Sequence, residues 1–145
     1  MAEEKEWQAG MKTYENIIFS CFGGLSNTGI TSALACLEAV KELGLGKGAN
    51  GCLPSVPLGV KPVLGKTKAA KKVITVDGCP FECSRKTLEE ASFSATRSIM
   101  LTRDTGMKKQ ALHTDIGQDL GVMAYISQEE VERAKDLIVK TVLEE

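Results

Sequence analysis

The sequence predicts a single α/β domain with a parallel or mostly parallel sheet and flanking helices. Short apolar segments at residues 16–21 and 73–76 have the composition of strands that are buried on both faces, as strands of parallel sheets are. Longer segments with apolar residues at helical spacing cover residues 30–43 and 128–143. Strands that alternate with helices are typical of an α/β fold. A chain of 145 residues without an internal repeat is expected to form one core.

Local patterns define the elements of the first half. After the first strand, residues 22–29 form a turn, and the helix over residues 30–43 ends at Gly44. Residues 44–65 are rich in glycine and proline, which indicates a loop with a short strand near residues 51–53. Residues 1–14 are polar and are expected to form an N-terminal tail. The predicted domain therefore covers residues 15–145.

A short helix over residues 66–71 is expected to lead into the strand at residues 73–76. The next helix begins at Pro80 or Arg85 and ends near Ala91. This order continues the strand and helix alternation of the first half.

Two further apolar runs lie in the last third of the chain. Residues 98–102 predict a fourth strand and residues 122–126 a fifth, with little periodicity between them. Ser127 and Glu130 have the spacing of a capping box, which places the start of the last helix there. That helix is expected to end near Leu143.

Composition and charge exclude several classes of protein. The formal net charge of −1 argues against a dedicated nucleic-acid binder. No window reaches the ~18 apolar residues that a membrane span needs, and the acidic N-terminus has no apolar core of the kind that a secretory signal has. A cytoplasmic location follows. The five cysteines are then expected to be reduced, as metal ligands, reactive thiols or buried apolar residues.

The chemistry is concentrated where the strand at residues 73–76 ends. The sequence continues as Asp77-Gly78-Cys79, and Cys83 follows four residues after Cys79. If a helix opens at Pro80, the two thiols share one face of it. Thiolates bind soft and borderline metals and also act as nucleophiles.

Two other cysteines are expected at the same edge of the sheet. Cys21 ends the first strand, and ligands of open parallel sheets bind outside the carboxyl ends of the strands. Cys52 lies on the segment between the two strands. Four thiolates make a closed tetrahedral zinc site. We therefore predict that one zinc ion is held by Cys21, Cys52, Cys79 and Cys83, in a structural, carrier or sensing role.

Three other chemistries use the same residues, so the sequence leaves open whether the protein is an enzyme. Cys79 and Arg85 have the spacing of cysteine-dependent phosphatases, although Pro80 removes an amide from the phosphate loop. Cys79 and Cys83 could instead perform thiol redox chemistry. An iron–sulfur cluster also takes four cysteines.

The remaining candidates have simpler interpretations. Cys36 lies within the amphipathic helix and is expected in the core. His113, the single histidine, is expected at the surface. Asp77 could orient the turn or contact an amide that surrounds the site, although an Asp before Gly is also common in turns for local reasons. Ser26 is expected to cap the first helix.

These motifs resemble the DGC-domain family over roughly residues 16–117. The most specific piece is Asp77-Gly78-Cys79-Pro80 followed by Cys83. The other matching pieces are Ser20-Cys21, Ser26-Asn27-Thr28-Gly29, Gly51-Cys52-Leu53-Pro54 and Lys86-Thr87-Leu88-Glu89. The family is described as holding zinc through four cysteines. The resemblance implies that Cys21, Cys52, Cys79 and Cys83 are those ligands here.

Overall fold

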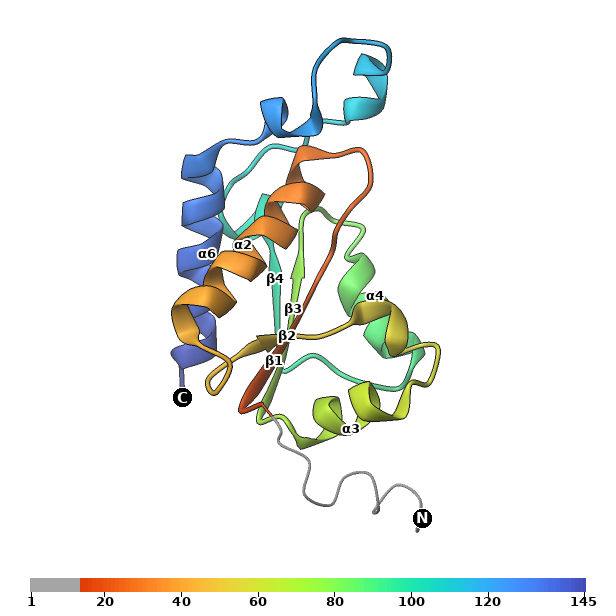
Figure 1. Ribbon diagram of the computed structural model, residues 1–145, viewed down its shortest axis with the longest axis vertical. Coiled ribbons are helices and arrows are strands. Elements are labelled where there is room, and N and C mark those ends of the chain that lie inside the picture. The colour runs from red at the N-terminus through yellow and green to blue at the C-terminus, as the bar shows by residue number, and fades with distance from the viewer. Residues whose placement is uncertain (1–13) are drawn as a thin grey trace.

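The computed structural model describes residues 14–145, and Figure 1 shows a parallel sheet between two layers of helices. The predicted α/β fold is confirmed. The predicted N-terminal tail lies outside the described residues except for Tyr14, which packs against the core. The strands are β1 (Asn16–Ser20), β2 (Ala49–Asn50), β3 (Lys72–Asp77) and β4 (Arg97–Met100).

The sheet has the order β2-β1-β3-β4, and every neighbouring pair is parallel. In the register of the central pair, Ile18 lies opposite Ile74 and Ser20 opposite Val76. Because side chains alternate along a strand, β1 and β3 present apolar residues to both faces. The carboxyl ends of β1 and β3 therefore lie side by side at one edge of the sheet.

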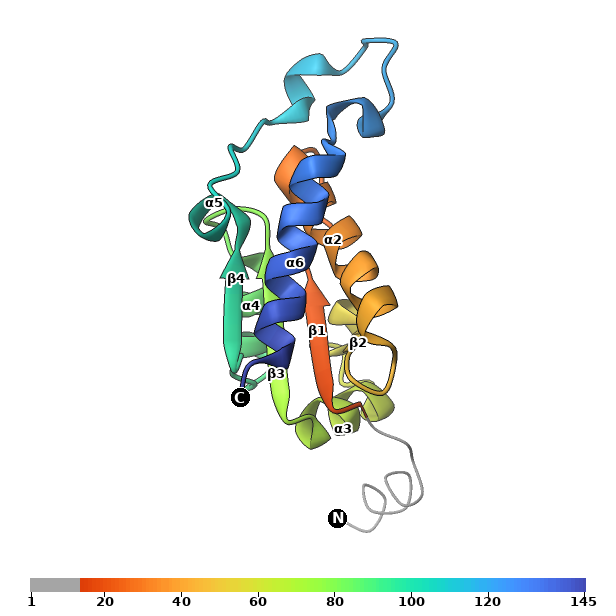
Figure 2. The ribbon, with the colours of Figure 1, turned by 90° about the vertical axis from the view of Figure 1, so that its left-hand side faces the viewer.

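One face of the sheet is covered by α2 (Asn27–Leu43) and α6 (Gln128–Leu143), as Figure 2 shows. Ile18, Ile74 and Val76 pack there against small and branched residues of the two helices. Ser26 caps α2 by accepting a hydrogen bond from the Gly29 amide, and Ser127 accepts one from the Glu130 amide at the start of α6. Both caps agree with the sequence, but α2 begins at Asn27, earlier than the predicted start at residue 30.

The opposite face is covered by α3 (Lys61–Ala69) and α4 (Cys83–Glu90). Phe19 and Ile17 of β1 pack there with Leu88 of α4. No helix within residues 14–145 has the length and apolar character that crossing a membrane requires.

Several predicted boundaries move in the structure. The helix expected over residues 66–71 begins earlier, with Pro62 in its first turn, where a missing amide costs nothing. The short strand expected near residues 51–53 is β2, two residues earlier, and a 3₁₀ turn follows it at Leu53–Ser55. The fourth strand ends at Met100, where α5 (Leu101–Asp104) begins.

The helix after Cys79 begins at Cys83, not at Pro80. Glu82 has a φ of 50°, in the left-handed region, so the chain turns sharply before α4. Cys79 therefore precedes the helix, and the expected sharing of one helix face by Cys79 and Cys83 is wrong. A turn in which the Glu82 amide donates to the Cys79 carbonyl at 3.1 Å separates the two residues instead.

The predicted fifth strand at residues 122–126 is also wrong. Val122–Tyr125 form a 3₁₀ turn, and Val122 and Met123 are exposed. This turn and the one at Leu112–Asp115 belong to the segment after α5, which extends beyond the carboxyl ends of the strands in Figure 1. An apolar run forms a strand only where a neighbouring strand can pair with it.

Candidate functional site

The candidate site lies at the point of the sheet where the order of strand addition reverses. From β1 the chain crosses to β2 on one side, and the next strand, β3, lies on the other side of β1. Such a point leaves a crevice between the two loops that follow the central strands, and ligands of α/β proteins bind there. Cys21 directly follows β1, and its amide donates to the carbonyl of Val76 at 2.9 Å. Cys79 lies in the loop that follows β3.

Two close backbone contacts, each of which requires a glycine, hold these loops against each other. A Cβ on Gly78 would lie 2.4 Å from the Thr28 carbonyl carbon at the start of α2. A Cβ on Gly29 would lie 2.5 Å from the Cα of Gly23. Real Cβ atoms do not approach so closely, so only glycine allows the β3–α4 loop to lie against the N-terminus of α2. This contact brings Cys79 toward Cys21.

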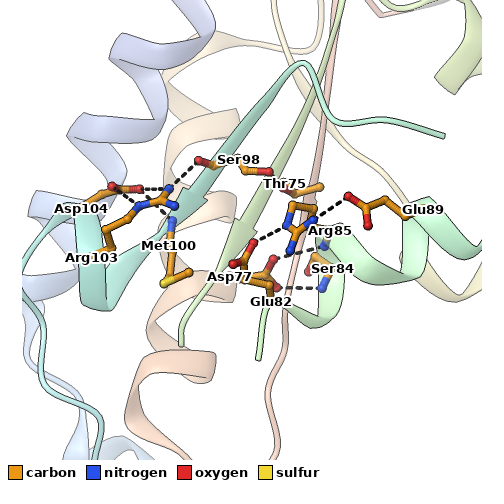
Figure 3. A network of polar contacts seen from close by, with 10 residues as sticks. All are labelled: Thr75, Asp77, Glu82, Ser84, Arg85, Glu89, Ser98, Met100, Arg103 and Asp104. Carbon is orange, nitrogen blue, oxygen red and sulfur yellow. Dashed lines mark hydrogen bonds and ion pairs between the residues drawn. The ribbon is translucent and has the colours of Figure 1, made fainter. Parts of the chain in front are cut away.

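Asp77 fixes the other end of the β3–α4 loop (Figure 3). One carboxylate oxygen accepts a hydrogen bond from the Ser84 amide at 2.7 Å, and the other accepts one from the Arg85 amide at 3.2 Å. Amides at a helix N-terminus have no partner within the helix, so Asp77 caps α4. Burial raises the pKa of the Asp77 carboxyl, and these amides act against the rise. Asp77 thus orients the turn by accepting hydrogen bonds from backbone amides.

Three of the predicted cysteines line one pocket of about 730 Å³ at this crevice. Cys21 and Cys79 are partly buried, and Cys83 is exposed at its mouth. Lys109 and His113 also line the pocket, from the segment after α5. The volume suits a small ligand. The crevice thus brings three thiols, an ammonium and an imidazole together.

The surroundings of Cys21 shift the pKa of its thiol. Burial is the main cause that raises the pKa of the Cys21 thiol. The amide of Gly23 hydrogen-bonds this sulfur and lowers the pKa, whereas Asp77, Cys83 and Cys79 raise it. The ammonium nitrogen of Lys109 lies 3.6 Å from the sulfur of Cys79 and 4.3 Å from the centre of the Phe81 ring. The pocket therefore has one positive charge close to Cys79.

Cys52 follows β2 at the same edge of the sheet, and the amide of Gly51 before it donates to the carbonyl of Ile18 at 2.8 Å. Cys52 is exposed, it precedes the 3₁₀ turn after β2, and its sulfur accepts a hydrogen bond from the Ser55 hydroxyl at 2.9 Å. It is not among the residues that line the pocket. Across residues 14–145, no three Cys, His, Asp or Glu side chains stand close enough together to hold an ion in this conformation. Ligation would require the exposed thiols to turn toward one another.

The residues of the competing interpretations are also placed. The guanidinium of Arg85 forms ion pairs with Glu82, just before α4, and with Glu89 of α4 (Figure 3). Arg85 does not line the pocket. Cys36 is buried in the core, as predicted, and burial raises the pKa of its thiol to about 11. His113 is exposed, as predicted, yet it lines the same pocket as three cysteines.

Sequence reasoning missed Lys109 and placed His113 away from the site. Both lie in the segment without periodicity, where no sequence pattern predicts which residues are close in space. One signal was available: His113 is the only histidine of the chain, and imidazole is a common partner of thiolates in zinc sites.

Comparisons with known proteins agree with the resemblance that the motifs suggested. The family model of the DGC domain matches residues 17–138. Neither the curated proteins nor the solved structures contain a match to this chain. The matched region contains all of the sheet except Asn16, and all residues that line the pocket. The chain belongs to the DGC-domain family.

Proposed function

We propose that the protein binds a thiophilic metal ion through Cys21, Cys79 and Cys83, and that this ion is zinc. One observation carries this proposal: three cysteines from the segments that follow two adjacent strands line a single pocket. Thiolate sulfur is a preferred ligand of zinc. Three thiols in one crevice are more than the packing of small buried side chains requires, because none of them belongs to the core.

The surroundings suit an anionic metal–thiolate centre. The N-termini of α2 and α4 lie beside the crevice and carry partial positive charge. Lys109 adds a full positive charge near Cys79. The hydrogen bond from the Gly23 amide to the Cys21 sulfur is of the kind that orients metal ligands.

Cys52 is the fourth ligand that the sequence predicts. Cys52 does not line the pocket in this conformation, so its side chain or its loop would have to move for it to share a metal ion with the other three. A site in which the protein fills all four positions has a structural, carrier or sensing role, because catalytic zinc keeps one position open. We place this function in the cytoplasm, where thiols stay reduced.

The same thiols could hold an iron–sulfur cluster, which also takes cysteine ligands. A cluster absorbs visible light and contains sulfide, whereas zinc thiolate is colourless. The identity of the metal is therefore decided by a spectrum.

Thiol chemistry at Cys79 is the second candidate, and Lys109 is the observation that favours it. A positive charge beside a cysteine is typical of reactive cysteines. The phosphatase form of this chemistry is disfavoured, because Glu82 and Glu89 already pair the guanidinium that would have to clamp a phosphoryl group.

The proposal is tested by replacing one ligand and one matched cysteine outside the pocket. We expect Cys79→Ser to lower the zinc content and the free energy of unfolding together, because metal binding and folding are coupled. Cys36→Ser is the control and should leave the zinc content unchanged, since Cys36 is buried in the core. A Cys79→Ser protein that carries as much zinc as the wild type, with equal stability, would end the assignment.

A further inference from the structure

We infer that the surface of α3 binds the acidic N-terminal segment of the same chain, with the side chain of Trp7 in a pocket beside Lys68. This segment, residues 1–13, lies outside the described residues, and the inference starts from the surface that would receive it. In Figure 1, α3 lies at the lower end of the molecule, away from the cysteine crevice. The inference is therefore independent of the proposed function.

A second pocket, of about 560 Å³, lies beside α3 and the loop that follows α4. Its apolar lining consists of Val56, Pro57, Leu64, Ala91 and Phe93, and Lys68 is the charged residue of the lining. Leu58 and Val60, which precede α3, are exposed as well. A hollow with this lining suits an aromatic or aliphatic side chain.

Positive charge surrounds this pocket. α3 carries Lys61, Lys66 and Lys68 and contains no acidic residue. Residues 43–76 contain six lysines and no aspartate, glutamate or arginine, although the formal net charge of the whole chain is −1. Among the described residues, no carboxylate forms an ion pair with Lys66 or Lys68. A cationic surface beside an apolar pocket is complementary to an acidic segment that carries an aromatic residue.

The N-terminal segment has this chemistry. Residues 3–7 read Glu-Glu-Lys-Glu-Trp, so three carboxylates lie close in sequence to Trp7, the single tryptophan of the chain. An indole ring has a large apolar surface, and a lysine beside its face adds a cation–π contact. With Trp7 in the pocket, the glutamates lie near the lysines of α3.

The chain enters the described structure next to the same helix. The ammonium of Lys66 lies 5.3 Å from the centre of the Tyr14 ring. The residues between Trp7 and Tyr14 span at most about 24 Å when extended, and a helix with its side chains is about 10–12 Å across. The segment is therefore long enough to pass around α3 to Lys68. Because it is tethered, its effective concentration at the pocket is high.

The fluorescence of Trp7 tests the inference directly, because no other tryptophan contributes. The full chain is measured at low salt with acrylamide as a neutral quencher, and the urea-unfolded chain is the reference for a solvated indole. We expect the folded wild type to emit at shorter wavelength than this reference and to be quenched less. The emission should not depend on protein concentration, since the segment and the pocket belong to one chain.

Changes of charge on either side should release the indole. We expect Lys68→Glu to shift the emission to longer wavelength and to raise quenching toward the unfolded reference, because like charges then face each other. The combined variant Glu3→Gln, Glu4→Gln and Glu6→Gln should shift it in the same direction, as should high salt. Lys140→Glu, at an exposed position of α6 on the opposite face of the sheet, is the control and should emit as the wild type does.

Three results would overturn the inference. A Trp7 that is as accessible in the folded wild type as in the unfolded reference leaves the surface to a separate acidic partner. Shielding that appears only at high protein concentration assigns the pocket to the segment of a second copy. Shielding that Lys68→Glu and Lys140→Glu reduce equally, or not at all, places Trp7 elsewhere. Circular dichroism of each variant verifies that the fold is kept, as expected for exposed lysines.

Discussion

The carboxylate of Asp77 lies 2.7 Å from the amide nitrogen of Ser84, so the last residue of β3 caps the helix that begins at Cys83. Asp77 is 2% exposed, and the same carboxylate also accepts from the Arg85 amide. One buried side chain thus fixes the geometry between the strand, the loop that contains Cys79 and the helix that carries Cys83. Asp77 and Gly78 are structural parts of the motif, whereas Cys79 faces the pocket.

Replacing Asp77 should loosen this geometry. We expect Asp77→Ala to lower the free energy of unfolding by about 2 kcal/mol, because two amides lose a charged acceptor in a buried place. Asp77→Asn should lose less, since it keeps one acceptor oxygen. Urea unfolding measures the effect, and Asp119→Ala, at an exposed position, is the control. A fully stable Asp77→Ala protein would show that the cap is not needed.

Gly78 should tolerate no side chain. Gly78→Ala places a Cβ within 2.4 Å of the Thr28 backbone, and backbone atoms cannot move aside without shifting α2. We expect a loss of about 1–3 kcal/mol in unfolding free energy, as for overpacked cores, and weaker metal binding. Gly121→Ala is the matched control, because a Cβ there meets no atom within 4 Å. Equal stability of the two variants would contradict the close contact.

Arg85 should prove to be a surface residue of α4 and no part of the pocket. Arg85→Ala removes ion pairs with Glu82 and Glu89, and surface pairs of this kind contribute little to stability because water and salt screen them. We expect a small loss of stability and an unchanged metal content. Arg133→Ala, which removes a helical pair with Glu129, is the comparison. Loss of metal in Arg85→Ala alone would show that the guanidinium reaches the site.

The Cys36 thiol should make the free energy of unfolding depend on pH in the alkaline range. Burial raises the pKa of its thiol from 9.0 to about 11, so between these values the unfolded chain loses a proton that the native chain keeps. Because the native state then binds more protons, the free energy of unfolding falls as the pH rises through this window. By pH 11 the loss amounts to about 2 kcal/mol.

The difference between the wild type and Cys36→Ala isolates this effect, because the other titrating groups are common to both. The wild type should lose more stability than Cys36→Ala between pH 9 and 11 in urea unfolding. Parallel curves would show that the Cys36 thiol is not shielded from water.

The sequence predicts the central strands and the long helices because each has a strong pattern of its own. Residues of β1 and β3 are apolar on both faces, and the capping residues Ser26 and Ser127 mark the start of α2 and α6. The two-residue strand β2 has no such pattern, since its pairing depends on β1. The apolar run at Val122–Tyr125 finds no strand to pair with and forms a turn.

The site was predictable to the extent that strand ends determine it. Cys21 and Cys79 follow adjacent parallel strands, so the edge rule brings them together. Cys52 follows an edge strand, and the same rule does not say how far its loop extends. The side chain of Asn27 is hydrogen-bonded to the backbone of Lys108 and Gln110, and these bonds hold the segment with Lys109 and His113 at the pocket. Such contacts between distant residues produce no periodic pattern in the sequence.

The most direct test of metal binding is the metal content of the chain itself. Protein purified anaerobically without chelator is analysed for metals and sulfide, and its visible spectrum is recorded. We expect about one zinc per chain and no visible colour, as for a thiolate zinc site. A brown protein with iron and sulfide would contradict zinc and keep the cysteine ligands. A chain that stays without metal, even after incubation with zinc under reducing conditions, would contradict the account.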